Sequence, residues 1–211
     1  MKQIELLTSR YPSLAGVRQD IYNAFLLLRS SYEVGGKLLV AGNGGSAADG
    51  EHIVGELMKG FKLPRKVTAE FAEKLVSVDK NMGTALAMNL QGALPAIALD
   101  GHFALTTAYA NDCDPALCFA QQVYGYGNIG DVLLAITTSG NSKNVLYAAM
   151  VAKAKGIKVL GLTGEKESKL SALADVCIRV PETETYMVQE LHLPVYHCLC
   201  LMLEECFFGD K

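Results

Sequence analysis

The chain has 211 residues, of which half are apolar and 19% are charged, and its 19 basic and 22 acidic side chains leave a net charge of −3. This length predicts one domain spanning residues 1–211, and the composition is that of a globular protein. No basic stripe indicates nucleic acid as a ligand, and no apolar run approaches the about 18 residues of a membrane span. The first residues lack the apolar region of a signal peptide, so we expect a cytoplasmic protein.

Six cysteines stand at positions 113, 118, 177, 198, 200 and 206, and no two form a Cys-x-x-Cys pair. Several lie in apolar segments such as LHLPVYHCLCLMLEECFF. Disulfides or a metal cluster are the alternatives, but the interpretation we favour is buried, reduced thiols in a cytoplasmic protein.

The first half of the chain is typical of helices around two short strands. Apolar residues recur at helical spacing through residues 1–34, before Gly35-Gly36 breaks the pattern. The elements that follow are a strand at 37–41, a tight loop at 42–46, a helix at 47–59, one or two helices within 61–94, a strand at 95–99, a helix at 102–110 and a segment running to about 124.

The second half alternates strands with helices more clearly. The predicted strands are 131–136, 158–162 and 176–180, and the predicted helices are 143–155, 168–174 and 182–206. Such alternation implies crossover connections between parallel strands. We therefore expect an α/β fold, a three-layer sandwich with a mostly parallel five-stranded sheet and extra helices at both ends.

A glycine-rich loop, Gly42-Asn43-Gly44-Gly45-Ser46, follows the first predicted strand. Its glycines let the backbone approach an anion, and the next helix offers free N–H groups at its N-terminus. The loop matches neither the Walker pattern nor the G-x-G-x-x-G pattern. A ligand loop and a simple tight turn are equally consistent with it.

A second polar loop, Thr137-Thr138-Ser139-Gly140-Asn141-Ser142, lies between a strand and a helix start. Hydroxyls and helix N–H groups suit a phosphate monoester. The alternative is that one serine caps the helix, but a cap needs only one such residue. We therefore favour ligand binding at this loop.

Ionisable side chains stand on two predicted helices. His52 and Glu56 are four residues apart and so share a helix face, either as a site or as an exposed pair. The apolar C-terminal helix also contains polar residues and a proline, which we expect to bend it. These residues are Gln189, Glu190, His192, His197 and Pro194.

The sequence resembles the SIS (sugar isomerase) domain and, within it, the phosphoheptose isomerase family. The resemblance covers nearly the whole chain. The matching stretches are GNGGSAADGEHIVGEL at 42–57, AND at 110–112, GDVLLAITTSGNSKNV at 130–145 and VQELHLPVYH at 188–197.

This resemblance implies a flavodoxin-like fold and an aldose–ketose isomerase that interconverts sedoheptulose 7-phosphate and D-glycero-D-manno-heptose 7-phosphate. It implies Glu56 and His197 as the acid–base pair and Zn²⁺ held by His52, Glu56, Gln189 and His197. A carboxylate and an imidazole suit proton transfer through an enediol, and N and O ligands suit zinc. The implied substrate-binding positions, with Ser46 beside them, are Asn43, Gly44, Gly45, His52, Glu56, Asn111, Asp112, Thr137, Thr138, Ser139, Ser142 and Gln189.

The chain departs from the family pattern in three places. Residues 61–94 form an insertion of roughly two dozen residues, expected as a surface or interface helix pair, with a specificity lid as the alternative. Thr137 replaces a serine, and Tyr186 replaces an acidic residue. On the C-terminal helix, Gln189 and His197 are separated by about 12 Å if that helix is straight.

The sequence alone is also consistent with other functions. A non-catalytic SIS protein that regulates replication by binding the initiator protein is the main rival, although this chain keeps the His/Glu/His set. An isomerase for another sugar phosphate and a sugar-phosphate sensing module are further alternatives. The apolar terminal helices and the family resemblance predict a homo-oligomer, a tetramer with active sites shared between subunits.

Overall fold

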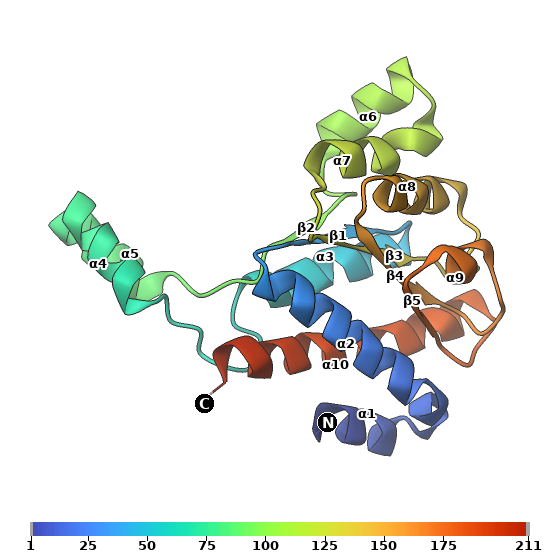
Figure 1. The fold of residues 1–211 in the computed structure, drawn as a ribbon, viewed down its shortest axis with the longest axis horizontal. Coiled ribbons are helices and arrows are strands. Elements are labelled where there is room, and N and C mark those ends of the chain that lie inside the picture. The colour runs from blue at the N-terminus through green and yellow to red at the C-terminus, as the bar shows by residue number, and fades with distance from the viewer. Residues whose placement is uncertain (1, 210–211) are drawn as a thin grey trace.

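The computed structural model describes residues 2–209 and contains one five-stranded sheet in which every strand pair is parallel (Figure 1). The strand order β2-β1-β3-β4-β5 is the doubly wound, flavodoxin-like order. The expected fold class is therefore confirmed. The strands are β1 (Leu38–Ala41), β2 (Ala96–Ala98), β3 (Val132–Ile136), β4 (Lys158–Thr163) and β5 (Val176–Arg179).

Helices cover both faces of this sheet and extend beyond it (Figure 1). The helices are α1 (Lys2–Arg10), α2 (Arg18–Glu33), α3 (Gly45–Met58), α4 (Ala69–Val78), α5 (Lys80–Asn89), α6 (Phe103–Asp112), α7 (Cys118–Tyr126), α8 (Lys143–Ala154), α9 (Lys169–Leu173) and α10 (Thr185–Phe208), with short 3₁₀ turns η1 (Pro12–Val17) and η2 (Pro115–Leu117).

Alternate residues of the central strands enter two separate hydrophobic cores, as a sheet buried on both faces requires. Leu38 and Val40 of β1 face the core built with α1, α2, α3 and α10. Leu39 and Ala41 face the core built with α7, α8 and α9. Because β1 and β3 are parallel, the loops that follow them lie at the same edge of the sheet.

Three element boundaries differ from expectation. The helical stretch at 1–34 is broken into α1, η1 and α2, because Pro12 starts a new turn where its missing N–H costs nothing. Helix α3 begins at Gly45, inside the glycine-rich loop. Helix α10 runs from Thr185 to Phe208 without interruption, with Pro194 inside it.

Residues 61–94 contain two helices, α4 and α5, which project from the body as a hairpin (Figure 1). Thr68 caps α4 by accepting from the Phe71 N–H, and Asp79 caps α5 by accepting from two N–H groups. The helices pack closely at Gly83, where a Cβ atom would overlap the carbonyl oxygen of Leu75. We call residues 68–90 the helical arm.

Helix α10 is long and apolar enough to cross a membrane by length and composition alone. It packs instead against α1, α2 and α3, and its central residues Val195, Tyr196 and Leu199 are buried in the core. It is therefore the core helix of the fold. Among the described residues all six cysteines are free, and Cys118, Cys198 and Cys200 are buried.

Candidate active site

Two loops at the carboxyl ends of β1 and β3 meet the first turns of α10 and line one cavity of about 270 Å³. This edge is where parallel α/β sheets bind ligands. Most of the lining residues were predicted, but Thr185 and Ile136 were not. The lining is Asn43, Gly44, Gly45, Ser46, Ile136, Thr137, Thr138, Ser142, Thr185 and Gln189. We call this cavity the loop pocket.

The glycines of the first loop allow close packing around the pocket. A Cβ atom on Gly45 would lie 2.6 Å from Nε2 of Gln189, so a larger residue there would displace the Gln189 amide from α3. Gly44 adopts φ +56°, a left-handed conformation that favours glycine. The loop is thus a tight turn that also forms one wall of the loop pocket, and the two interpretations of its sequence are compatible.

The hydroxyls of the second loop face one another rather than capping α8. Thr137 Oγ1 lies 2.8 Å from Ser142 Oγ, and Ser142 makes no side-chain capping hydrogen bond. Ser142 therefore gives no acceptor to the N–H groups of Lys143 and Asn144, which are available to an anion, whereas the Val145 N–H donates to Asn144 Oδ1 at 3.0 Å. Ser139 is exposed and its Oγ accepts from the Asn141 N–H, so it does not line the pocket.

A pair of amides joins the two loops, which the sequence did not indicate. Asn43 and Asn144 exchange hydrogen bonds of 3.0 and 2.8 Å between their side-chain amides. These two hydrogen bonds connect the two loops across the sheet edge, although the two asparagines are 101 positions apart.

A second group of polar side chains forms where α3 packs against α10. The His52 Nε2 atom lies 3.1 Å from Glu56 Oε1 and 3.5 Å from His197 Nε2. Lys59 donates to the other Glu56 oxygen at 3.1 Å. The structure therefore brings three of the predicted site residues together, and we call His52, Glu56 and His197 the polar cluster.

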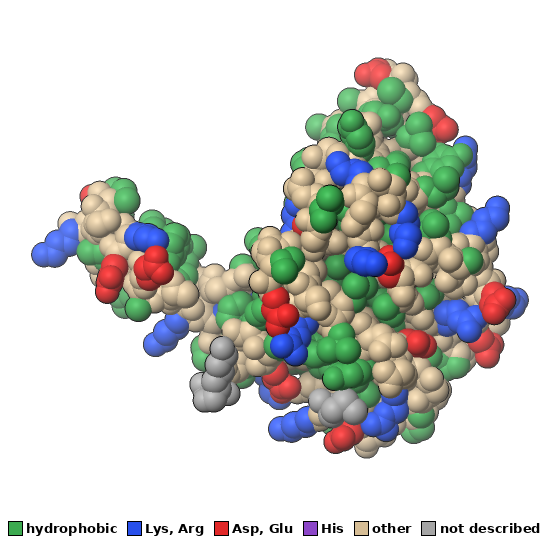
Figure 2. Space-filling model, in the orientation of Figure 1, with side chains coloured by type: hydrophobic (Ala, Val, Ile, Leu, Met, Phe, Trp, Pro, Cys, Tyr) green, Lys and Arg blue, Asp and Glu red, His purple; other side chains and the backbone are tan. Residues whose placement is uncertain are grey.

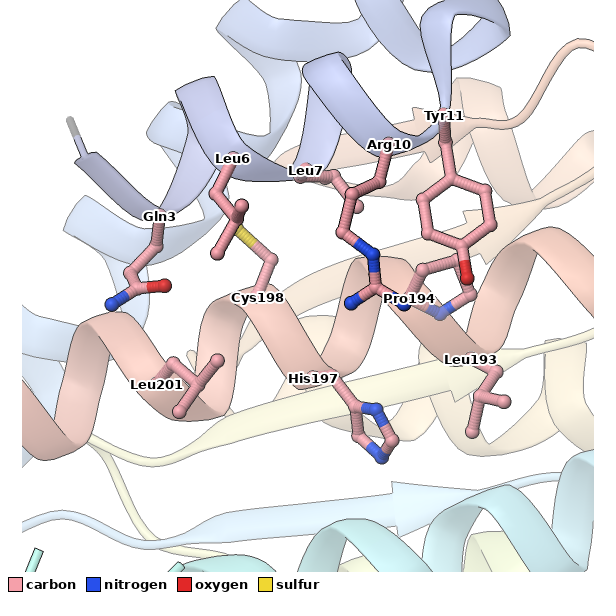
Figure 3. A pocket seen from close by; sticks show the side chains of 10 residues that line it. All are labelled: Gln3, Leu6, Leu7, Arg10, Tyr11, Leu193, Pro194, His197, Cys198 and Leu201. Atoms are coloured by element: carbon pink, nitrogen blue, oxygen red, sulfur yellow. The ribbon is translucent and has the colours of Figure 1, made fainter. Parts of the chain in front are cut away.

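Electrostatics favour a neutral His197. Burial lowers the pKa of His197, the neighbouring His52 lowers it further, and only the Glu56 carboxylate raises it. A neutral imidazole can give or take one proton near neutral pH. His197 also borders a cavity of about 290 Å³ between α1 and α10, and its ring extends away from the α1 side chains (Figure 3).

Two further residues hold the polar cluster, and neither was predicted. The hydroxyl of Tyr196 lies 3.0 Å from His52 Nδ1 and donates to Asp49 Oδ1 at 3.2 Å. Their positions gave a weak signal, because Asp49 is one turn before His52 and Tyr196 adjoins His197. Only the packing of α10 on α3 shows that these side chains meet.

Two predicted residues lie elsewhere in the single chain. Asn111 and Asp112 are exposed at the C-terminal end of α6, where the Asn111 amide donates to Asp112 at 2.9 Å. Neither residue lines the loop pocket.

The expected metal ligands are divided between the two places. Gln189 lies in the loop pocket against Gly45, whereas the other three form the polar cluster. Tetrahedral ligands about 2.0–2.1 Å from Zn²⁺ lie roughly 3.3 Å apart, close to the two measured separations in the cluster. Within residues 2–209, however, no three His, Cys, Asp or Glu side chains converge in an arrangement that would hold a metal ion. The chemical types of the four side chains thus fit zinc, but their positions in one chain do not, because the four do not converge on one point.

Comparisons with known proteins identify the family. The SIS domain family model matches residues 92–202. Phosphoheptose isomerase from Aneurinibacillus thermoaerophilus is 37% identical over 180 residues, which are 85% of this chain and 78% of the relative. Phosphoheptose isomerase 2 from Campylobacter jejuni is 38% identical over 189 residues, which are 90% of this chain and 81% of the relative.

Solved structures give the same assignment. A phosphoheptose isomerase from Francisella tularensis is 32% identical with a TM-score of 0.71, and the match covers 96% of this chain and 91% of that one. The enzyme from Neisseria gonorrhoeae is 29% identical with a TM-score of 0.72 and the same coverage. The chain therefore belongs to the phosphoheptose isomerase family of SIS-domain enzymes.

Proposed function

We propose that this protein is an aldose–ketose isomerase that interconverts sedoheptulose 7-phosphate and D-glycero-D-manno-heptose 7-phosphate. The observation that carries the proposal is that one helix, α10, contributes both to an anion-binding pocket and to an acid–base cluster. Gln189 lines the loop pocket and His197 belongs to the polar cluster. Membership in the phosphoheptose isomerase family supports the same substrate class.

The spacing along α10 favours a long sugar phosphate. Eight residues separate Gln189 from His197, about 12 Å at 1.5 Å per residue. An extended chain advances roughly 1.2 Å per bond, so a heptose 7-phosphate spans about 10 Å from phosphorus to C1 and a triose phosphate about 5 Å. A heptose can place its phosphate at the Thr137–Ser142 loop while its C1–C2 end reaches the polar cluster.

The residues of the polar cluster suit the proton transfer that the reaction needs. The Glu56 carboxylate takes a proton from the carbon beside the carbonyl while His197, neutral because burial lowers its pKa, gives a proton to the carbonyl oxygen, and the two transfers together give an enediol. His197 then takes the proton of the other enediol hydroxyl, and Glu56 returns its proton to the former carbonyl carbon. The side chains of Asn43, Thr137 and Ser142 hold the phosphate end without a cation.

We also propose that Zn²⁺ binds at His52, Glu56 and His197, whereas Gln189, the fourth ligand implied by the family resemblance, lies in the loop pocket. Bound there, the ion would polarise the substrate carbonyl. Zinc content of the purified protein, measured by mass spectrometry, tests this. We expect one equivalent in the wild type and loss of it in His52→Asn, and no zinc in the wild type after growth with the metal would contradict it.

The test of the main proposal is turnover of sedoheptulose 7-phosphate, followed by phosphorus and proton NMR with and without added zinc. We expect a new aldose phosphate signal that Glu56→Gln and His197→Ala reduce by at least about 10²-fold. Glu51→Gln is the matched control, because Glu51 is an exposed carboxylate on the same helix α3 outside the polar cluster. It should leave the rate unchanged.

The other outcomes distinguish the alternatives. Turnover of a different sugar phosphate keeps the isomerase chemistry and changes the substrate. Binding without turnover of any sugar phosphate favours a non-catalytic regulator of replication initiation. We further propose a cytoplasmic homotetramer with shared sites, because Asn111 and Asp112 lie outside the loop pocket of their own chain. Analytical ultracentrifugation measures the assembly, and a monomer would contradict it.

A further inference from the structure

We propose that Tyr196 is a positioning residue whose hydroxyl fixes the ring orientation and the tautomer of His52. The expected effect on turnover rests on the proposed function, whereas the tautomer of His52 can be measured without it.

The geometry begins with the packing of α10 on α3. Tyr196 is only 2% exposed, and its ring meets the His52 ring edge to face at 5.5 Å between centroids. Its hydroxyl reaches His52 Nδ1 at 3.0 Å and Asp49 Oδ1 at 3.2 Å. Asp49 and His52 stand one turn apart on α3, so the hydroxyl links two side chains of the same helix face.

The direction of these hydrogen bonds follows from the groups involved. A tyrosine hydroxyl has one hydrogen, and an ionised carboxylate can only accept. The hydroxyl therefore donates to Asp49, and its oxygen accepts from His52. Nδ1 of His52 therefore carries a hydrogen.

The other ring nitrogen, Nε2, points into the polar cluster. His52 Nε2 is the atom that lies 3.1 Å from Glu56 and 3.5 Å from His197. The His52 side chain is 41% exposed, so solvent competes for its nitrogens and packing alone does not hold the ring. The Tyr196 hydroxyl thus selects which nitrogen of His52 faces the reacting groups, as outer hydrogen-bond partners of site histidines commonly do.

The first experiment reads the tautomer directly. Histidine labelled with ¹⁵N in the metal-free protein gives long-range ring correlations, and the His52 signals are identified by their absence in His52→Asn. We expect the Nδ1–H form in the wild type and a mixture of both tautomers in Tyr196→Phe. The Nε2–H form in the wild type, or the same tautomer in both proteins, would overturn the proposal.

The second experiment compares two tyrosine variants on the substrate. Tyr196→Phe removes only a hydroxyl, and Tyr32→Phe is the matched control, since the Tyr32 hydroxyl also bonds within the fold, to the Pro95 carbonyl at 3.3 Å. We expect kcat to fall about 10–100-fold in Tyr196→Phe, with KM changed less than about threefold because the loop pocket is intact. Tyr32→Phe should keep both constants.

Two substitutions of Asp49 test whether an acceptor for the Tyr196 hydroxyl is what matters. Asp49→Asn keeps an oxygen that accepts from Tyr196, whereas Asp49→Ala removes it. We expect Asp49→Asn to stay within about threefold of wild-type kcat, Asp49→Ala to match Tyr196→Phe, and the double variant to be no slower than either. Equal rates in Tyr196→Phe and Tyr32→Phe would sink the proposal while leaving the isomerase assignment intact. If the wild type turns over no heptose phosphate, the tautomer measurement still tests whether Tyr196 positions His52.

Discussion

The helical arm and the core helix α10 both contain many apolar residues, but these lie in opposite environments. In α10 most of the apolar residues from Val188 to Leu203 are buried against three other helices. In the arm, no residue of α4 and only Gly83 of α5 is buried, and hydrophobic side chains lie on its surface (Figure 2). Val78, Met82 and Met88 are each more than half exposed. Apolar periodicity thus predicts a helix in both regions, but only the surrounding structure decides whether its apolar face is covered.

The two regions are joined through a buried ion pair. Arg65, at the base of the arm, donates to Glu204 of α10 at 2.8 Å, and both side chains are almost fully buried. The Arg65 guanidinium also donates to the carbonyl oxygens of Glu56 and Leu57 at the end of α3. Although burial alone raises the pKa of Glu204, the Phe61 and Lys62 N–H groups and Arg65 lower it on balance. The base of the arm therefore belongs to the core, while its tip does not.

The largest effect is expected from breaking this ion pair. Arg65→Met leaves Glu204 buried without its positive partner, which we expect to lower the free energy of unfolding by about 3–5 kcal/mol. Urea denaturation followed by circular dichroism measures it. Arg29→Met is the control, because the Arg29–Glu33 pair has a similar 2.7 Å contact but is exposed. It should cost less than about 1 kcal/mol. Equal losses of unfolding free energy in Arg65→Met and Arg29→Met would contradict the expected difference between a buried and an exposed ion pair.

The next effect concerns a histidine buried in the same core. Burial lowers the pKa of His192 to about 4, although its interaction with the Thr163 backbone raises it. The unfolded chain binds more protons at His192 than the folded chain does between about pH 6.5 and pH 4. The stability that the folded protein has with a neutral His192 is therefore fully present above pH 6.5 and is lost as the pH falls. The loss should reach about 3 kcal/mol.

The pH dependence is checked by difference. Unfolding free energies of the wild type and of His192→Leu, measured from pH 7.5 to pH 4, should diverge from each other by the amount that His192 contributes. Other titrating groups, such as Glu204, cancel in this comparison. Parallel curves would show that His192 is not held neutral in the folded protein.

The smallest effect is expected from removing the arm itself. Its two ends are close, since the Gly92 N–H donates to the Arg65 carbonyl at 2.7 Å and Lys66 pairs with Gln91. Replacing residues 68–90 by a short Gly-Ser linker should therefore change the free energy of unfolding of the body by less than about 1 kcal/mol, because no arm side chain enters the core. Thermal unfolding with circular dichroism measures this. A loss as large as that of Arg65→Met would show that the arm supports the core.

Much of the fold could be predicted because its signals are local. Buried strands bounded by glycine and polar loops, alternating with helical patterns, indicated a parallel sheet, and the structure has all five strands close to the predicted positions. The boundary at Gly45 was missed because α3 begins within the glycine-rich turn. Pro12 divides the N-terminal helices although apolar spacing continues across it.

The candidate site was predicted less evenly. His52 and Glu56 could be paired from spacing because a helix places residues four apart on one face. Tyr196 and Asp49 could not be paired, since they are 147 positions apart and meet only when α10 packs on α3. The same packing places Gln189 against Gly45 and His197 against His52, as the separation of about 12 Å along a straight helix had indicated.

The sequence by itself determined the α/β class, the two polar loops and the chemistry-bearing side chains, because hydrophobic period, glycine conformation and hydrogen-bonding capacity are properties of short segments. The tertiary structure alone decided which loops share a pocket, which tyrosine supports which histidine, and that one apolar helix is buried while the arm is exposed. These depend on contacts between residues distant in the chain, and each such contact forms only when the sheet has set the positions of the helices around it.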